Sequence, residues 1–249
     1  MKAKTENAAV ILCAGKGTRM GDSPINKVCF DCAGAPVIRR VVQNMRAGGV
    51  GRFVIVVGHR AESVMGALDG EDGVLYAFQK EQKGTGHAAL CGLKVLRDIG
   101  FGGNVIVSMG DKIVRSETVA GLLANAKGAK AVWGVQMREA NPNGGRVVMD
   151  DGGKLAGVVE LADAGLMAIK GLPESAWAGK LAELGLNPKK AAKVVDRAKL
   201  PGALSSVPER RFGKDAAQIL LSKYANAGLY CFDADSVTEA IGSLGSDNA

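Results

Sequence analysis

The feature that most constrains this sequence is an apolar run that leads directly into a loop of glycines and cations. Residues 8–13 (AAVILC) are short and continuous enough to predict a strand buried on both faces of a parallel sheet. The loop that follows consists mainly of glycines and polar or basic side chains: Gly15, Lys16, Gly17, Thr18, Arg19, Gly21 and, further on, Lys27. Backbone N–H groups and cations can surround a phosphate chain, so the loop predicts an anion site rather than an ordinary solvated turn.

Two better-known glycine loops do not match. The dinucleotide fingerprint G-x-G-x-x-G would need glycine at Met20, and no acidic residue closes the next apolar run, residues 53–58. The P-loop would need Gly-Lys followed by Ser or Thr, where this sequence has Gly21 and Asp22. A Rossmann NAD site and a P-loop are therefore not expected.

A third pattern does match. Residues 12–20 (LCAGKGTRM), with Lys27 downstream, closely resemble the signature of the sugar-nucleotide pyrophosphorylases, and their uridylyltransferase domains are the nearest likeness. The resemblance covers residues 8–160 and resumes at residue 224. It implies an α/β fold of the nucleotide-diphospho-sugar transferase type: a Rossmann-like, mostly parallel sheet flanked by helices, here with a helical insertion. It also implies a cytoplasmic enzyme that forms UDP-N-acetylglucosamine, a cell-envelope precursor, and pyrophosphate from UTP and N-acetylglucosamine 1-phosphate.

Alternating strand and helix patterns independently predict an α/β domain with a largely parallel sheet. Periodicity places helices at residues 36–45, 61–68 and 85–96, and strands at residues 53–58, 74–78 and 105–109. In such sheets, ligands bind at the carboxyl ends of the strands. The loops that follow these strands are therefore the expected positions of functional residues.

The resemblance assigns roles to residues of these loops. Arg19 and Lys27 would be catalytic, stabilising the leaving phosphates and the reacting α-phosphate. Asp111 follows a strand and would hold Mg²⁺, which prefers oxygen ligands and keeps several waters. The substrate-binding positions would be Leu12, Ala14, Gly15 and Gly17 in the loop, Gln79, Gln82, Gly84 and Thr85 at the uracil, and Gly145, Glu160 and Asn226 at the sugar.

Two further expectations concern single residues in these segments. His87 falls in the first turn of an expected helix, where packing or capping is a better interpretation than catalysis. Glu160 is expected on a strand, residues 154–161 (KLAGVVEL).

Residues 164–221 depart from the family pattern and predict a basic helical insertion. Helices are expected at residues 173–186, 188–198 and 214–223, the first two beginning near a proline. Residues 165–220 hold ten Lys and Arg against five Asp and Glu, in a chain whose net charge is +7. A basic surface could bind nucleic acid, but these charges alternate with Ala and Leu and few aromatics accompany them. Solvated helix faces are expected, with a lid beside the sugar site as the other interpretation.

The chain as a whole is expected to be one nucleotidyltransferase domain, residues 1–249, shortened at its C-terminal end. A longer relative would continue into a second magnesium ligand and, in bifunctional members, an acetyltransferase domain. The 47% hydrophobic content can supply a sizeable core, yet no apolar run approaches the roughly 20 residues of a membrane span.

Five cysteines raise a separate question. Cys29 and Cys32 have C-x-x-C spacing, but no second pair or nearby histidine completes a zinc set, so buried reduced thiols are expected.

Two functional alternatives stay open. The chain could transfer a nucleotide with another base, or to another phosphorylated acceptor. It could instead be a nucleotide-binding module without turnover, whose basic insertion engages a partner.

Overall fold

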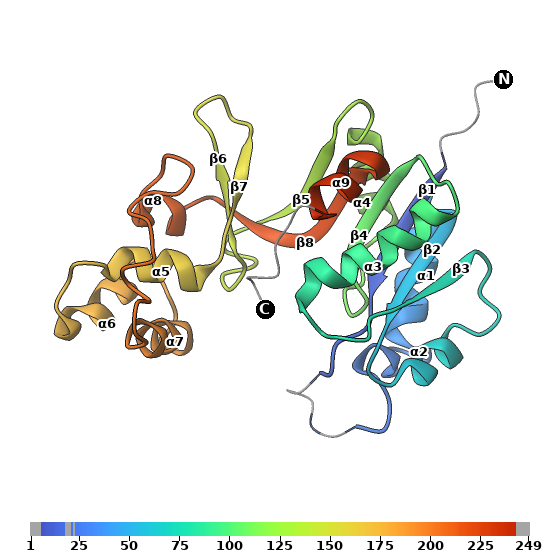
Figure 1. Ribbon diagram of the computed structural model, residues 1–249, viewed down its shortest axis with the longest axis horizontal. Helices are drawn as coiled ribbons and strands as arrows, with labels where there is room; N and C mark the ends of the chain where they lie inside the picture. Colours follow the sequence, from blue (N-terminus) through green and yellow to red (C-terminus); the bar gives the residue numbers. More distant parts are fainter. Residues whose placement is uncertain (1–5, 18–20, 22, 243–249) are drawn as a thin grey trace. The chain divides into compact units, whose positions relative to one another are not determined.

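The computed structural model describes residues 6–17, 21 and 23–242. The chain divides into two compact units: unit 1 spans Met1–Trp133 and Gly228–Ala249, and unit 2 spans Gly134–Ala227 (Figure 1). Two strands, β5 (Ala131–Met137) and β8 (Tyr224–Asp233), run from one unit into the other.

Unit 1 is built on a mostly parallel sheet, which confirms the expected fold class. Four parallel strands lie in the order β3-β2-β1-β4: β1 (Asn7–Leu12), β2 (Arg52–Val57), β3 (Val74–Phe78) and β4 (Asn104–Met109). The last part of β8 pairs antiparallel with β4. Every residue of β1 after Asn7 is buried, because β1 lies inside the sheet and both its faces are covered.

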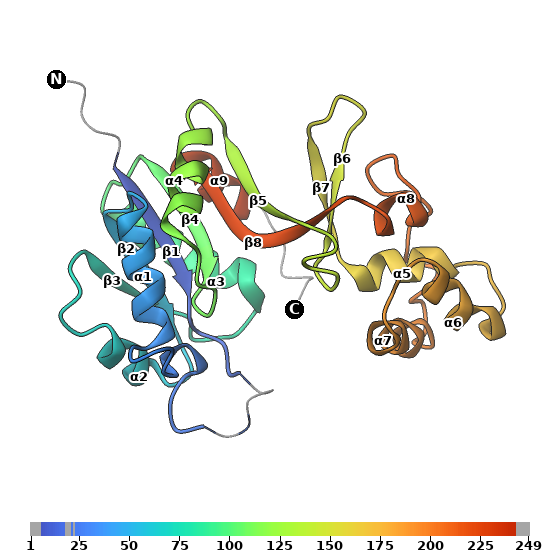
Figure 2. The same cartoon turned by 180° about the vertical axis from the view of Figure 1, so that it is seen from behind.

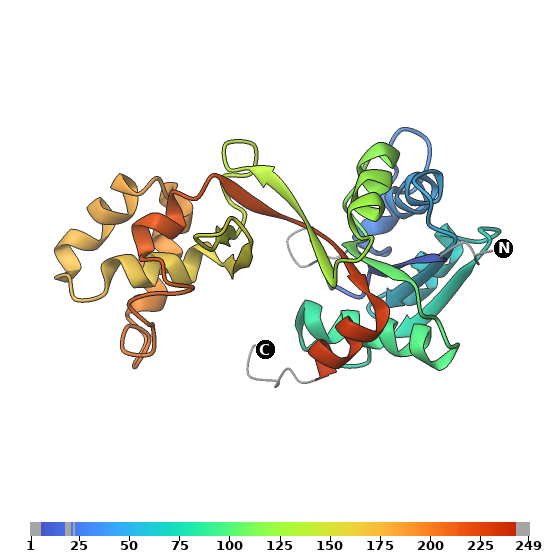
Figure 3. The same ribbon diagram turned by 90° about the horizontal axis from the view of Figure 1, so that it is seen from above.

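Helices cover both faces of this sheet. The helices α1 (Val37–Ala47), α2 (Ala61–Ala67) and α4 (Ser116–Asn125) pack on one face, and α3 (Gly84–Asp98) and α9 (Ala234–Gly242) on the other (Figures 2 and 3). Alternation along β1 divides its side chains between the two cores, with Ile11 facing α1 and Val10 facing α3. At Gly92 of α3, a Cβ would lie 2.4 Å from Val10 Cγ1, so glycine allows the helix to approach the strand closely.

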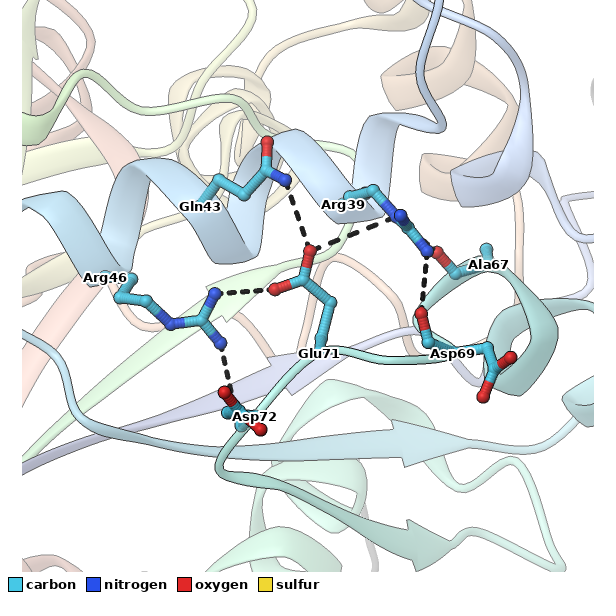
Figure 4. Close-up of polar contacts among 7 residues, drawn as sticks. All are labelled: Arg39, Gln43, Arg46, Ala67, Asp69, Glu71 and Asp72. Carbon is cyan, nitrogen blue, oxygen red and sulfur yellow. Dashed lines mark hydrogen bonds and ion pairs between the residues drawn. The ribbon is translucent and has the colours of Figure 1, made fainter.

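An ion network fastens α1 to the segment between α2 and β3 (Figure 4). The Glu71 carboxylate, only 10% exposed, lies 2.5 Å from Arg46 Nη1 and accepts a hydrogen bond from Gln43 Nε2 at 3.2 Å. Arg46 and Arg39 also donate to backbone carbonyls of this segment and of the last residue of α2. The hydrogen bond from Arg46, more than the opposing effect of burial, holds the pKa of Glu71 below its usual value.

Unit 2 has a core of its own. It contains the hairpin β6 (Arg146–Met149) and β7 (Leu155–Val159), followed by α5 (Leu161–Ile169), α6 (Glu174–Glu183), α7 (Pro188–Ala198) and α8 (Ala216–Leu220). Apolar side chains of these helices gather around Leu166, Ile169 and Leu181, which are fully buried. Helices are present where residues 173–186 and 188–198 predicted them, and α8 is shorter than the predicted residues 214–223.

Several basic side chains of unit 2 are exposed and pair with carboxylates. Arg197 and Arg211 both pair with Asp163, and Lys199 pairs with Glu174, with exposed fractions of 42% or more for the three cations. Of these three cations only Arg197 lies within a helix, α7, so the pairs show solvated charges rather than solvated helix faces.

All five cysteines are free thiols: Cys13 and Cys231 are buried, and Cys29, Cys32 and Cys91 are half-buried. No three His, Cys, Asp or Glu side chains gather as a metal cluster within the described residues. Among the helices of residues 6–17, 21 and 23–242, none combines the length and apolar character that crossing a bilayer requires.

Candidate active site

Four loops meet at the carboxyl ends of the parallel strands of unit 1. Backbone hydrogen bonds connect them: Gly110 N–H donates to Leu12 O at 3.0 Å, and His59 N–H donates to Ala14 O at 3.2 Å. The Gln82 side chain also donates to Ala14 O, at 2.8 Å. The structure therefore places the loops after β1, β2, β3 and β4 at one edge of the sheet, as the parallel order requires.

Lys27 and Asp111 form an ion pair at this edge. Asp111 follows β4, and Lys27 begins the short helix η2 (Lys27–Cys29); Lys27 Nζ lies 2.6 Å from Asp111 Oδ2. Both side chains are partly exposed, at 31% and 42%. Lys27 and Asp111 are 84 residues apart in the sequence and were predicted to belong to one site. In the structure they are in direct contact and accessible to solvent.

Two groups near this pair, the Cys13 thiol and the Lys112 ammonium, have shifted pKa values. Burial is the main reason that the pKa of the Cys13 thiol is raised, and the nearby Cys29 and Asp111 raise it further. Cys13 is therefore a protonated packing group below the loop. Burial lowers the pKa of Lys112, while the Asp111 carboxylate acts in the opposite direction.

The glycine loop offers backbone donors. Gly15 and Lys16 are exposed, and no described residue accepts a hydrogen bond from the amides of Gly15, Lys16 or Gly17. Gly17 has φ of +64°, a left-handed conformation that favours glycine, and it lies against the Lys27 side chain. Arg19, the other predicted catalytic cation, lies outside the described residues.

The predicted base-binding segment connects β3 to α3. Gln79 is buried, and its Nε2 donates to Gly84 O at 3.2 Å and lies 3.1 Å from Nδ1 of His87. His87 therefore packs against this segment, as expected. Helix α3 begins at Gly84 without a side-chain cap, and Gly84 and Thr85 are exposed, so its first N–H groups are accessible to a ligand.

The three predicted sugar-binding residues meet in unit 2. Asn226 N–H donates to Gly145 O at 2.8 Å, and a Cβ on Gly145 would lie 2.8 Å from Glu160 Oε1. One expectation was wrong: Glu160 is not on a strand but occupies the N-cap position of α5, since β7 ends at Val159. The reason is that the apolar spacing of residues 161–169 suits a helix, which begins immediately after the strand.

Two buried residues that shape these loops were not predicted. Arg146 is 4% exposed and donates to the carbonyls of Leu220, Gly144 and Pro142, which fixes the turn before β6. Asn26 is 2% exposed and precedes Lys27. A single Arg or Asn gives no periodic pattern from which its burial could be predicted. Asn is a common N-cap residue, so the N-cap position of Asn26 could have been predicted, but its other contacts could not.

The carboxylate of Asp111 is a suitable magnesium ligand. The residue supplies an exposed carboxylate oxygen, and Mg²⁺ is commonly held by one or two carboxylates together with phosphates and waters. Asp111 is the residue of unit 1 that would hold the ion.

Comparisons with known proteins identify the family of the chain. Residues 9–196 match the model of the MobA-like NTP transferase domain. A protein named bifunctional protein GlmU from Pelobacter propionicus is 35% identical over 246 residues, which cover 97% of this chain and 42% of the relative. The GlmU protein of Syntrophotalea carbinolica is 40% identical over 161 residues, which cover 64% of this chain and 34% of the relative.

The chain thus spans well under half the length of these curated relatives. Among solved structures, a nucleotidyl transferase from Methanothermobacter thermautotroptrophicus is 25% identical, covers 48% of this chain and 57% of its own, and has a TM-score of 0.41. The family match covers most of the sequence, including the first loop, Asp111 and Glu160, so the chain belongs to the family of MobA-like NTP transferase domains.

Proposed function

We propose that this chain transfers the uridylyl group of UTP to N-acetylglucosamine 1-phosphate. The observation that carries the proposal is the Lys27–Asp111 pair, which lies among the four loops at the carboxyl edge of the sheet. The sequence resemblance to uridylyltransferases supports UTP as the donor, and the meeting of Gly145, Glu160 and Asn226 supports a sugar acceptor.

In the proposed reaction, a phosphate oxygen of the sugar 1-phosphate attacks the α-phosphorus of UTP. A new P–O bond forms, the bond from the α-phosphorus to the bridging oxygen breaks, and pyrophosphate leaves with that electron pair. Because the substrate itself supplies the nucleophile, the protein's task is to position the phosphates and stabilise their charge.

The residues of unit 1 would divide this task. Lys27 would stabilise the reacting α-phosphate, the amides of the glycine loop would bind phosphate oxygens, and Arg19 would stabilise the leaving phosphates. Asp111 would hold Mg²⁺, which when bound neutralises charge on the phosphate oxygens. Gln79, Gln82 and Thr85 would contact the uracil, together with the first turn of α3.

The test has two steps. Calorimetric titration with UTP, CTP, GTP and ATP should show preference for UTP, because an unmatched base edge leaves buried polar groups unpaired. Pyrophosphate release should then be measured with several sugar 1-phosphates, and N-acetylglucosamine 1-phosphate should be the fastest acceptor.

Two variants sharpen the test. Asp111→Asn should abolish most turnover, whereas Asp98→Asn, which breaks the exposed Arg97–Asp98 pair on α3, should not. Equal affinity for all four triphosphates would exclude the uridylyl assignment. Tight binding of UTP without pyrophosphate release for any acceptor would indicate a nucleotide-binding module.

A further inference from the structure

The side chain of Asn26 forms hydrogen bonds to several segments of unit 1. Its Nδ2 donates to His59 O at 2.9 Å and to Cys13 O at 3.0 Å, with a longer shared contact to Gly15 O at 3.4 Å. Its Oδ1 accepts a hydrogen bond from Val28 N–H at 3.2 Å. One buried amide therefore connects the loop after β1, the loop after β2 and the short helix η2.

The main chain of Asn26 is anchored separately. Its N–H donates to Ser63 Oγ at 3.0 Å, and the Ser63 hydroxyl donates to Arg60 O at 2.7 Å. Both the side chain and the backbone of Asn26 are thus held by neighbouring segments. Lys27 follows directly, so the same anchors fix the backbone from which Lys27 reaches Asp111.

Only an amide can make this set of contacts. An asparagine side chain offers two N–H donors and a carbonyl acceptor, whereas an ionised aspartate offers acceptors alone. The three oxygens that face Nδ2 are backbone carbonyls, so a carboxylate at this buried position would face them without a proton to share.

The contact with Gly15 has a consequence for the loop. The carbonyl of Gly15 and the N–H of Lys16 belong to one planar trans peptide, in which the two groups point in opposite directions. Drawing the Gly15 carbonyl inward to Asn26 therefore turns the Lys16 N–H outward. Lys16 is exposed, and no described residue accepts a hydrogen bond from its N–H.

We infer that Asn26 is a positioning residue for phosphate binding, in a role that rests on the proposed function: its amide turns the Lys16 N–H outward and fixes Lys27 beside Asp111. Asn26 contacts no substrate in this role. It acts through the loop and through Lys27.

The test compares variants at the two ends of β1. Asn26→Ala and Asn26→Asp remove the donors beyond the carboxyl end of the strand. The matched control is Asn7→Ala at the other end, where Asn7 Nδ2 donates to Gly49 O at 3.1 Å and Oδ1 accepts from Asn104. Each protein is titrated calorimetrically with UTP and with inorganic pyrophosphate, and its unfolding midpoint is measured.

We expect Asn26→Ala and Asn26→Asp to weaken binding of both probes by about tenfold or more, the effect of losing one aligned hydrogen bond to a charged phosphate oxygen. Asn7→Ala should lower the unfolding midpoint yet bind both probes as the wild type does. Asn26 variants that fold and bind within twofold of the wild type would overturn the inference.

Wild-type protein that binds neither probe would overturn the proposed function and the inference with it. Wild-type protein that binds both probes, together with Asn26 variants that bind equally well, would overturn the inference alone. If the Asn26 variants do not fold, Ser63→Ala removes the bond to the Asn26 main chain and keeps its side chain. We then expect a severalfold loss of affinity, and unchanged affinity in Ser63→Ala would overturn the inference.

Discussion

Replacing Glu71 by Gln tests how the ion network of unit 1 stabilises the fold (Figure 4). The substitution keeps the shape of the side chain but removes the charge that faces Arg46 at 2.5 Å and Arg39 at 4.0 Å. Both arginines keep backbone carbonyl partners and are about one-third exposed, at 37% and 34%, so neither becomes an orphaned buried charge.

The expected cost follows from this intermediate burial. Exposed ion pairs contribute roughly 0–1 kcal/mol, and breaking a fully buried pair costs roughly 3–5 kcal/mol. The Glu71 side chain is 10% exposed and its partners are about one-third exposed, so we expect Glu71→Gln to lower the free energy of unfolding by about 1–2 kcal/mol at pH 7.

Urea denaturation followed by tryptophan fluorescence can measure this loss in unit 1 alone. Trp133 lies in unit 1 and Trp177 in unit 2, so all proteins carry Trp177→Phe and Trp133 reports. The control is Glu81→Gln, which breaks the exposed Lys83–Glu81 pair and should leave the unfolding curve unchanged.

The difference between wild type and Glu71→Gln should also depend on pH. The pKa of Glu71 is lowered in the folded protein, so its contribution is complete above the ordinary value of 4.5 and is lost as pH falls through the lowered value. Equal stability at pH 7, or a difference that persists undiminished at strongly acidic pH, would refute the reasoning.

Three other substitutions test individual contacts. Gly145→Ala adds a methyl group 2.8 Å from Glu160 Oε1, so the carboxylate must move; KM for the sugar phosphate should rise with UTP affinity unchanged, and an unaltered KM would contradict the sugar assignment. Lys27→Met should reduce turnover about a hundredfold in a pyrophosphate-release assay while the unfolding midpoint hardly changes, because its pair with Asp111 is exposed. Gly92→Ala places a methyl 2.4 Å from a valine methyl of β1 and should cost about 2 kcal/mol in urea denaturation; wild-type stability would mean that α3 can shift away.

The central strands could be predicted because their sequences are unambiguous. Continuous apolar runs that end in glycine or polar loops predicted β1 to β4 to within about two residues, although β3, at the edge of the sheet, is mostly half-buried. The parallel order then brings the loops to one edge, so the meeting of Lys27 and Asp111 was also predictable.

Other features depend on contacts that local patterns do not encode. Residues 116–125 and 131–137, where the sequence pattern predicts no element, form α4 and β5. The start of helix α5 was not predicted, because Glu160 at its N-cap makes no side-chain capping bond of the kind that marks a helix start. Residues 154–161 were therefore assigned to one continuous strand. The proposed role of Asn26 depends on backbone carbonyls up to 33 residues away in the sequence. No local pattern around Asn26 predicts that these carbonyls lie beside its side chain.

The proposed function is the direct transfer of a uridylyl group to a sugar phosphate. The most direct test uses N-acetylglucosamine 1-phosphate labelled with oxygen-18 at its non-bridging phosphate oxygens, incubated with UTP and Mg²⁺ and analysed by mass spectrometry. The account predicts a UDP-sugar that keeps the full label and an unlabelled pyrophosphate, since the acceptor's own oxygen forms the new P–O bond. Absence of a UDP-sugar from a folded protein that binds UTP, or appearance of the label in pyrophosphate, would contradict it.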